Sequence, residues 1–175
     1  MYRRGFTIVE LLIVIVIIAI LATITVVAYN GITQRSQASA VASDLRATIK
    51  GFMLYKEATG MSTWTVESDS SWNGLVTGNP TIASIITYNS VFREFLTKAP
   101  ANTGTGSSTA WLYDNEGDTY VNCQVNSNGV NLILQNVTNT TVAQLIDAAV
   151  DDGDTTCGAM HMSGTSLIYN LSKTP

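Results

Sequence analysis

The apolar residues of this chain gather near its N-terminus. No charged residue occurs from Leu11 to Tyr29, a run of 19 residues that reads LLIVIVIIAILATITVVAY. A helix needs about 20 mostly apolar residues to cross a hydrocarbon core of about 30 Å. The apolar region of a cleaved secretory signal is shorter, at about 7–15 residues. The run therefore predicts a transmembrane helix rather than a buried helix of a soluble domain.

The charges on either side of this run predict its orientation. Arg3 and Arg4 precede it, and the next basic residue is Arg35. Positive charge at a short N-terminal end keeps that end in the cytoplasm. We therefore expect the chain after Tyr29 to lie outside the cytoplasmic membrane.

After Tyr29 the pattern becomes amphipathic. Apolar residues recur at spacings of about three and four, which is the period of a helix with one apolar face. Thr59-Gly60 is a typical helix end, and no proline occurs before Pro80. We expect one helix from near Phe6 to about Ala58, roughly 80 Å long at 1.5 Å per residue. The residues of the expected apolar face are Ile32, Ala38, Val41, Leu45, Ile49, Phe52 and Met53.

The C-terminal part of the chain carries strand patterns. Runs rich in β-branched and aromatic residues are separated by polar, glycine-containing turns at 115–118 and 126–129, which predicts an antiparallel meander. The expected strands are 109–114, 119–125, 130–137 and 166–171, and helices are expected at 90–98 and 141–150. One face of the sheet would cover the amphipathic helix. The fold class is α+β, with a long N-terminal helix packed on a small antiparallel sheet.

Composition narrows the range of functions. The net charge is −4, so a nucleic-acid binder that relies on positive charge is not expected. One histidine and two cysteines are too few for a zinc site of four Cys and His ligands. No catalytic constellation is evident, and we expect no enzyme, no cofactor and no metal. Acidic turns at 114–118 and 151–154 could bind calcium, but they do not match the twelve-residue EF-hand loop, and solvated turns are favoured.

Residues 3–22 (RRGFTIVELLIVIVIIAILA) resemble the class III signal and N-terminal helix of type IV prepilins. The matching features are a short basic leader, Gly5, Phe6 directly after it, and Glu10 four residues further on. The resemblance implies that a prepilin peptidase cuts between Gly5 and Phe6 and N-methylates the new amine of Phe6. It also implies that Glu10 pairs with the Phe6 amine of a neighbouring subunit and so sets the register of assembly. Many family members carry a proline near the position of Val27, and this chain does not.

Glu10 is the one acidic residue at the edge of the apolar block. A carboxylate inside a bilayer costs on the order of 2.5–3.5 kcal/mol on insertion scales. In the uncut chain Glu10 could instead reach the interface near Arg4. Pairing with a neighbour's amine would satisfy both charges after cleavage.

Cys123 and Cys157 both lie in the part expected outside. Two cysteines in an oxidising compartment most simply form one disulfide. The resemblance implies that this bond pins the C-terminal loop to the sheet. A catalytic Cys157 with His161 nearby is the rival interpretation, and it is disfavoured because exported cysteines usually pair.

The sequence therefore predicts a leader at 1–5, a membrane and fibre-core helix at 6–29, an amphipathic half at 30–60 and a globular head at 61–175. The expected function is that of a structural subunit of a type IV pilus, made as a single-pass membrane protein and polymerised with itself into an extracellular filament. The pilus would serve adhesion, twitching motility or DNA uptake, with the prepilin peptidase and an assembly platform as partners. A pseudopilin of a secretion or competence system is the nearer alternative, and a membrane-anchored binding domain that never polymerises is the more distant one.

Overall fold

The computed structural model describes residues 5, 7–61, 79–100, 111–115, 120–122, 125–127 and 130–171. The chain divides into two compact units, Met1–Ser36 and Gln37–Pro175, and each is described here by itself. Phe6 and Cys123 lie outside the described residues, as do residues 62–78 and 101–110.

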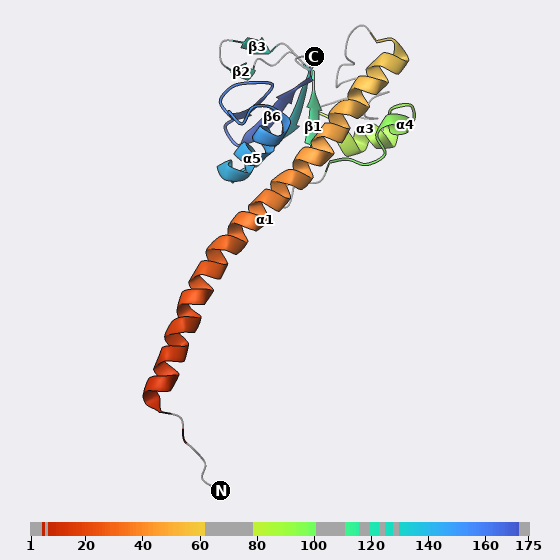
Figure 1. Cartoon of the computed structure of the whole chain (residues 1–175). Helices are drawn as coiled ribbons and strands as arrows, with labels where there is room; N and C mark the ends of the chain where they lie inside the picture. The colour runs from red at the N-terminus through yellow and green to blue at the C-terminus, as the bar shows by residue number, and fades with distance from the viewer. Residues whose placement is uncertain are drawn as a thin grey trace. The chain divides into compact units, whose positions relative to one another are not determined.

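Helix α1 runs from Ile8 to Thr59, a length of 52 residues, which confirms the long N-terminal helix (Figure 1). It ends in a Schellman motif. Gly60 has φ 65°, its N–H donates to the Glu57 carbonyl at 3.2 Å, and the Met61 N–H donates to the Lys56 carbonyl at 3.2 Å. Glycine suits this position because it adopts a positive φ without a steric cost.

The main sheet has four antiparallel strands in the order β1-β4-β6-β5. The strands are β1 (Trp111–Asp114), β4 (Asn131–Leu134), β6 (Ser166–Asn170) and β5 (Met160–Ser163). β5 and β6 form a hairpin in which Ser163 pairs with Ser166, and Gly164, with φ 58°, opens the two-residue turn. Glycine is the residue that such tight turns favour at a positive φ. β5 was not expected from the sequence.

The predicted three-strand meander is wrong. The run 119–125 contains the short strand β2 (Tyr120–Asn122), which pairs in a separate sheet with β3 (Val125–Ser127), a strand that extends into the turn expected at 126–129. β1 instead pairs directly with β4, from Trp111 opposite Leu134 to Asp114 opposite Asn131. The segment between β1 and β4 thus forms its own hairpin, so the two longer strands become neighbours without a tight turn between them.

In the part of the second unit that the structure describes, three shorter helices accompany α1 and the sheet. α3 (Ile82–Tyr88) was not expected; it begins at Thr81, whose side chain accepts a hydrogen bond from the Ser84 N–H at 3.0 Å. α4 (Phe92–Phe95) is the core of the helix expected at 90–98. α5 (Thr140–Val150) matches the expected helix at 141–150 and is capped by the Asn139 side chain.

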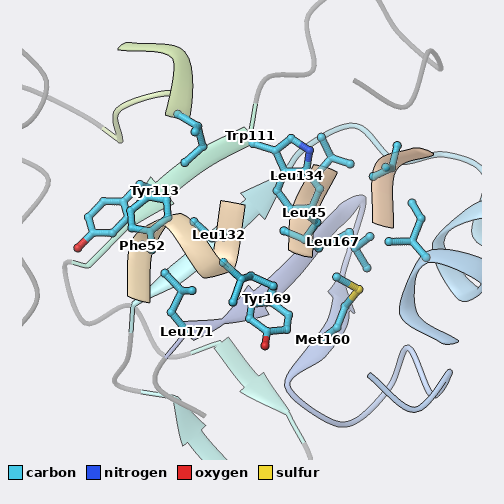
Figure 2. Packing of buried hydrophobic residues seen from close by; sticks show 14 of the residues in the cluster. Leu45, Phe52, Trp111, Tyr113, Leu132, Leu134, Met160, Leu167, Tyr169 and Leu171 are labelled. Carbon is cyan, nitrogen blue, oxygen red and sulfur yellow. The ribbon is translucent and has the colours of Figure 1, made fainter. Parts of the chain in front are cut away.

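The core of the second unit forms between the later part of α1 and the sheet. Leu45 and Phe52 are fully buried and Ile49 is nearly so, as the pattern predicted, whereas Ile32 is 68% exposed. Figure 2 shows Leu45 and Phe52 of α1 among apolar side chains of the strands. The ring of Phe52 stacks on Tyr113 with centroids 5.5 Å apart and meets Phe92 at 4.7 Å. The labelled partners come from the strands and from the residue after β6, and they are Trp111, Tyr113, Leu132, Leu134, Met160, Leu167, Tyr169 and Leu171.

Candidate functional site: the N-terminal segment

Thr7 and Glu10 together cap the first turn of α1. The Thr7 N–H donates to Glu10 Oε2 at 2.8 Å, and the Thr7 hydroxyl donates to the same oxygen at 2.8 Å. In return the Glu10 N–H donates to Thr7 Oγ1 at 3.3 Å. This reciprocal pattern is a capping box, which satisfies backbone N–H groups that have no carbonyl partner at a helix start. The Glu10 carboxylate is therefore held at the first turn, at the edge of the apolar run.

Gly5 precedes this cap in an exposed, non-helical position. A Cβ built on Gly5 would meet nothing within 4 Å. Of the two residues at the expected cleavage bond, Gly5 is thus open to solvent on the described chain, and Phe6 lies outside the described residues. An exposed segment outside regular structure suits a peptidase site, because cleavage requires an accessible backbone.

The residues that follow form the first part of α1, and their apolar side chains are exposed on the described chain. From Thr7 to Gly31 every side chain is exposed, and the first buried residue of α1 is Ala38. Large apolar side chains such as Leu12, Ile18 and Val27 are 55%, 59% and 71% exposed. This helix is long and apolar enough to cross a membrane, and none of the apolar window is buried. Such a surface calls for lipid or other apolar helices around it.

Two threonines inside the apolar run direct their hydroxyls to the helix itself. Thr23 Oγ1 donates to the Ala19 carbonyl at 2.8 Å, and Thr25 Oγ1 donates to the Leu21 carbonyl at 2.7 Å. Polar groups in hydrocarbon must be satisfied internally, and these hydroxyls are. The run therefore presents an apolar outer surface despite its threonines.

Of the two cysteines in the predicted disulfide, only Cys157 lies among the described residues. Cys157 lies half-buried in the loop before β5, where its N–H donates to the Asp154 carbonyl at 2.9 Å. Cys123 lies outside the described residues, so the Cys123–Cys157 disulfide stays a proposal. Among the described residues no cysteine is free. His161, the other member of the rival catalytic pair, is buried on β5 opposite Ile168.

The acidic turn after α5 is ordered by its own side chains. Asp154 Oδ1 accepts hydrogen bonds from the Thr156 hydroxyl at 2.5 Å and from the Thr156 N–H at 3.0 Å. These bonds, with the hydroxyl contributing most, lower the pKa of Asp154 below its usual value. In the other acidic turn Asp114 is buried at the end of β1, while Glu116 and Asp118 lie outside the described residues.

Sequence reasoning missed the role of Thr7. The signal was present, because Thr followed by Glu three residues later, just ahead of an apolar run, is the pattern of a capping box. It also missed Asp147, which joins Asp151 and Asp152 in space. Their spacing of four residues, from Asp147 to Asp151, would have indicated neighbours on one side of a helix end.

Comparison with known proteins bears on the same N-terminal segment. Residues 1–26 match the family model described as the prokaryotic N-terminal methylation motif. Neither the curated proteins nor the solved structures contain a match to the chain. The matched residues include Gly5, Phe6 and Glu10, and they end inside the uncovered apolar helix. On a chain whose long apolar helix accompanies a small antiparallel sheet, this N-terminal methylation motif supports a type IV pilin-like family, with a membrane-anchored precursor.

Proposed function

We propose that this chain is a structural subunit of a type IV pilus. The observation that carries the proposal is the methylation motif at residues 1–26 on a helix whose apolar surface stays exposed. A soluble protein rarely exposes a continuous apolar surface of this size. A subunit that first sits in a bilayer and then packs with identical helices covers that surface at both stages.

Processing would convert the membrane precursor into an assembly-competent subunit. A prepilin peptidase cuts between Gly5 and Phe6 and methylates the new amine of Phe6. Removal of residues 1–5 also removes Arg3 and Arg4, the only basic residues ahead of the apolar run. Glu10 then needs another cation close to the apolar core, since an unpaired carboxylate there is costly.

Assembly would supply that cation from a neighbouring subunit. The amine of Phe6 on one subunit and the carboxylate of Glu10 on the next each lack an opposite charge in an apolar surrounding. Only one axial step between subunits brings the two groups together, so the pair selects a register for helices that otherwise slide on one another. Packing of the apolar surfaces would provide the cohesion of the fibre.

The second unit would form the outward-facing head of each subunit. Its core closes around the later part of α1, with Phe52 against Tyr113 and Phe92. The role in the proposal is structural rather than catalytic: the head displays a surface for adhesion, motility or DNA uptake, and the helix joins subunits into an extracellular filament.

The mass of the mature N-terminus in protein from the native host tests the proposal. We expect a chain that begins at Phe6 and carries one methyl group on its amine. An intact Met1 start in abundant native protein would overturn processing, and with it the filament. Electron microscopy of sheared cell-surface material then separates the two assembled forms, since a pilus subunit is recovered in long surface filaments and a pseudopilin is not.

A further inference from the structure

Three aspartates meet at the C-terminal end of α5. Asp147 lies in the last turn, Asp151 is the C-cap residue, and Asp152 follows it. One carboxylate oxygen from each of the three lies within 4.8 Å of the others. Three like charges at this separation repel one another unless a proton or a cation lies between them.

Asp147 is the unusual member of this cluster. Its side chain is fully buried, and among the residues that the structure describes neither carboxylate oxygen has a hydrogen-bond partner of normal distance and angle. Burial raises the pKa of Asp147 to about 6, with Asp151 and Asp152 adding to the rise and the Gly153 N–H lowering it by less. Buried carboxylates in proteins are normally hydrogen-bonded, paired with a cation or bound to a metal. The surroundings of the Asp147 carboxylate therefore suit a cation.

The helix end adds to the negative potential. The carbonyl groups at the C-terminus of a helix carry a partial negative charge, which favours basic residues there. The last turn of α5 contains no basic residue. Among the described residues, the charges that shift the pKa of Asp147 are all carboxylates, those of Asp151, Asp152 and Asp154. A cation at this point would oppose both the carboxylates and the helix dipole.

The loop after α5 holds the two outer carboxylates in place. Asp151 Oδ2 accepts a hydrogen bond from the Met160 N–H at 2.9 Å, and Asp152 Oδ1 accepts one from the Asp154 N–H at 2.8 Å. Gly158 makes room for the first of these, because a Cβ there would lie 2.3 Å from Asp151 Oδ2. Each outer carboxylate is therefore anchored through one of its oxygens.

The ligand set selects the class of ion. Carboxylate oxygens are hard ligands that suit calcium or magnesium rather than zinc or copper. Two oxygens that both bind calcium at about 2.4 Å lie no more than about 4.8 Å apart, which the three aspartates satisfy without rearrangement. Magnesium demands an almost ideal octahedron and retains water, so an irregular cluster at a helix end fits it poorly.

We propose that Asp147, Asp151 and Asp152 form a calcium site at the C-terminal end of α5. Water and nearby backbone carbonyls would complete the six to eight oxygens that calcium takes. The ion joins α5 to the loop that leads into β5, and so stabilises the part of the second unit that contains Cys157. The expected dissociation constant is that of extracellular modules, about 10⁻⁴–10⁻³ M.

Calcium titration of the full-length chain in detergent tests the site. The protein is stripped with a chelator and dialysed at near-neutral pH, and CaCl₂ is then added while heat release and Tm are followed. We expect saturable binding and a rise in Tm with CaCl₂ and a weaker response to MgCl₂. Asp152→Asn should weaken calcium binding about tenfold or more, because it removes an exposed ligand charge. Glu57→Gln, which removes one exposed charge on α1, is the matched control and should bind as the parent does.

Several results would overturn the site. The first is the absence of a calcium-dependent change in Tm or heat up to millimolar CaCl₂, and the second is equal binding by Asp152→Asn and Glu57→Gln. An equal response to MgCl₂ would refute the assignment to calcium. Asp147→Asn should abolish binding, and if that variant does not fold, Asp152→Asn still decides the question, because its side chain is exposed.

Discussion

Thr7 and Glu10 hold each other at the start of α1, with the Thr7 N–H and hydroxyl both 2.8 Å from Glu10 Oε2. The carboxylate that the family resemblance assigns to contact between subunits is thus already fixed within its own chain. Holding it at the first helical turn lowers the conformational entropy lost when a neighbour's amine approaches. Thr7 therefore positions Glu10, and two kinds of variant separate the positioning role from the role of the charge.

Glu10→Gln should sharply reduce or abolish filament assembly and leave membrane insertion intact. The amide can still cap the helix but carries no charge to pair with an amine. The measurement compares sheared surface filaments with the amount of protein in the membrane fraction. Normal filament yield from Glu10→Gln would refute the charge pair.

Thr7→Ala should have a milder effect on assembly than Glu10→Gln. It removes the capping hydroxyl, a change that costs about 0.5–2 kcal/mol of helix stability, and keeps the carboxylate. Thr7→Ser retains the hydroxyl and serves as the control. If Thr7→Ala lost filaments as completely as Glu10→Gln, capping rather than charge would be the requirement.

Gly5→Leu should block leader removal without disturbing the fold. A Cβ on Gly5 meets nothing within 4 Å, so a larger side chain has no clash within the described chain. Any loss of processing then reports on the peptidase. Mass spectrometry should find residues 1–5 retained and the methyl group absent, and normal processing would contradict the assignment of the site.

Phe52→Ala should destabilise the second unit by about 3–5 kcal/mol, because it empties the space between two aromatic rings in a close-packed core. Thermal unfolding of the detergent-solubilised chain measures the loss. Leu54→Ala, two residues on and 40% exposed, should change stability by no more than about 0.5 kcal/mol. Equal losses from the two variants would contradict the packing of α1 on the sheet.

In the presence of a chelator, lowering the pH should reduce the electrostatic repulsion at Asp147, because its carboxylate takes up a proton. Its folded-state pKa of about 6 lies above its ordinary value of 3.8, so the folded chain binds the proton more tightly than the unfolded chain. This group therefore adds stability below about pH 4, and that contribution is lost as the pH rises through about 6. The lowered pKa of Asp154 has the opposite effect on stability. Its contribution is present at higher pH and is lost as the pH falls into the acidic range.

The difference in Tm between the parent and Asp147→Asn, followed against pH in chelator, isolates this effect. The other carboxylates that act on Asp147, those of Asp151, Asp152 and Asp154, remain in both proteins. We expect the Tm of Asp147→Asn to rise relative to the Tm of the parent as the pH increases from about 4 to about 7. A constant difference across that range would contradict a raised pKa.

The sequence by itself determined α1, its end and its two kinds of surface. A charge-free run needs an apolar surrounding whatever the rest of the chain does, and a 3.6-residue period buries one face, as Leu45 and Phe52 do. Thr7 with Glu10 and Thr59 with Gly60 mark the helix ends through contacts within a few residues. The methylation motif is equally local, since a peptidase reads adjacent positions.

Only the tertiary structure decided the strand order and the acidic cluster. Strand pairing depends on which distant segments meet, and local turn signals carry no information about that. The turn signals predicted that 119–125 lies between β1 and β4 in the sheet, whereas β1 and β4 pair directly with each other. The strand MHMS was missed because it has only four residues and none of them is β-branched or aromatic, and its position comes from pairing with β6. Asp147 looks like any helical aspartate in the sequence. Its burial beside Asp151 and Asp152 arises because packing of α5 encloses it, and a local pattern carries no information about that packing.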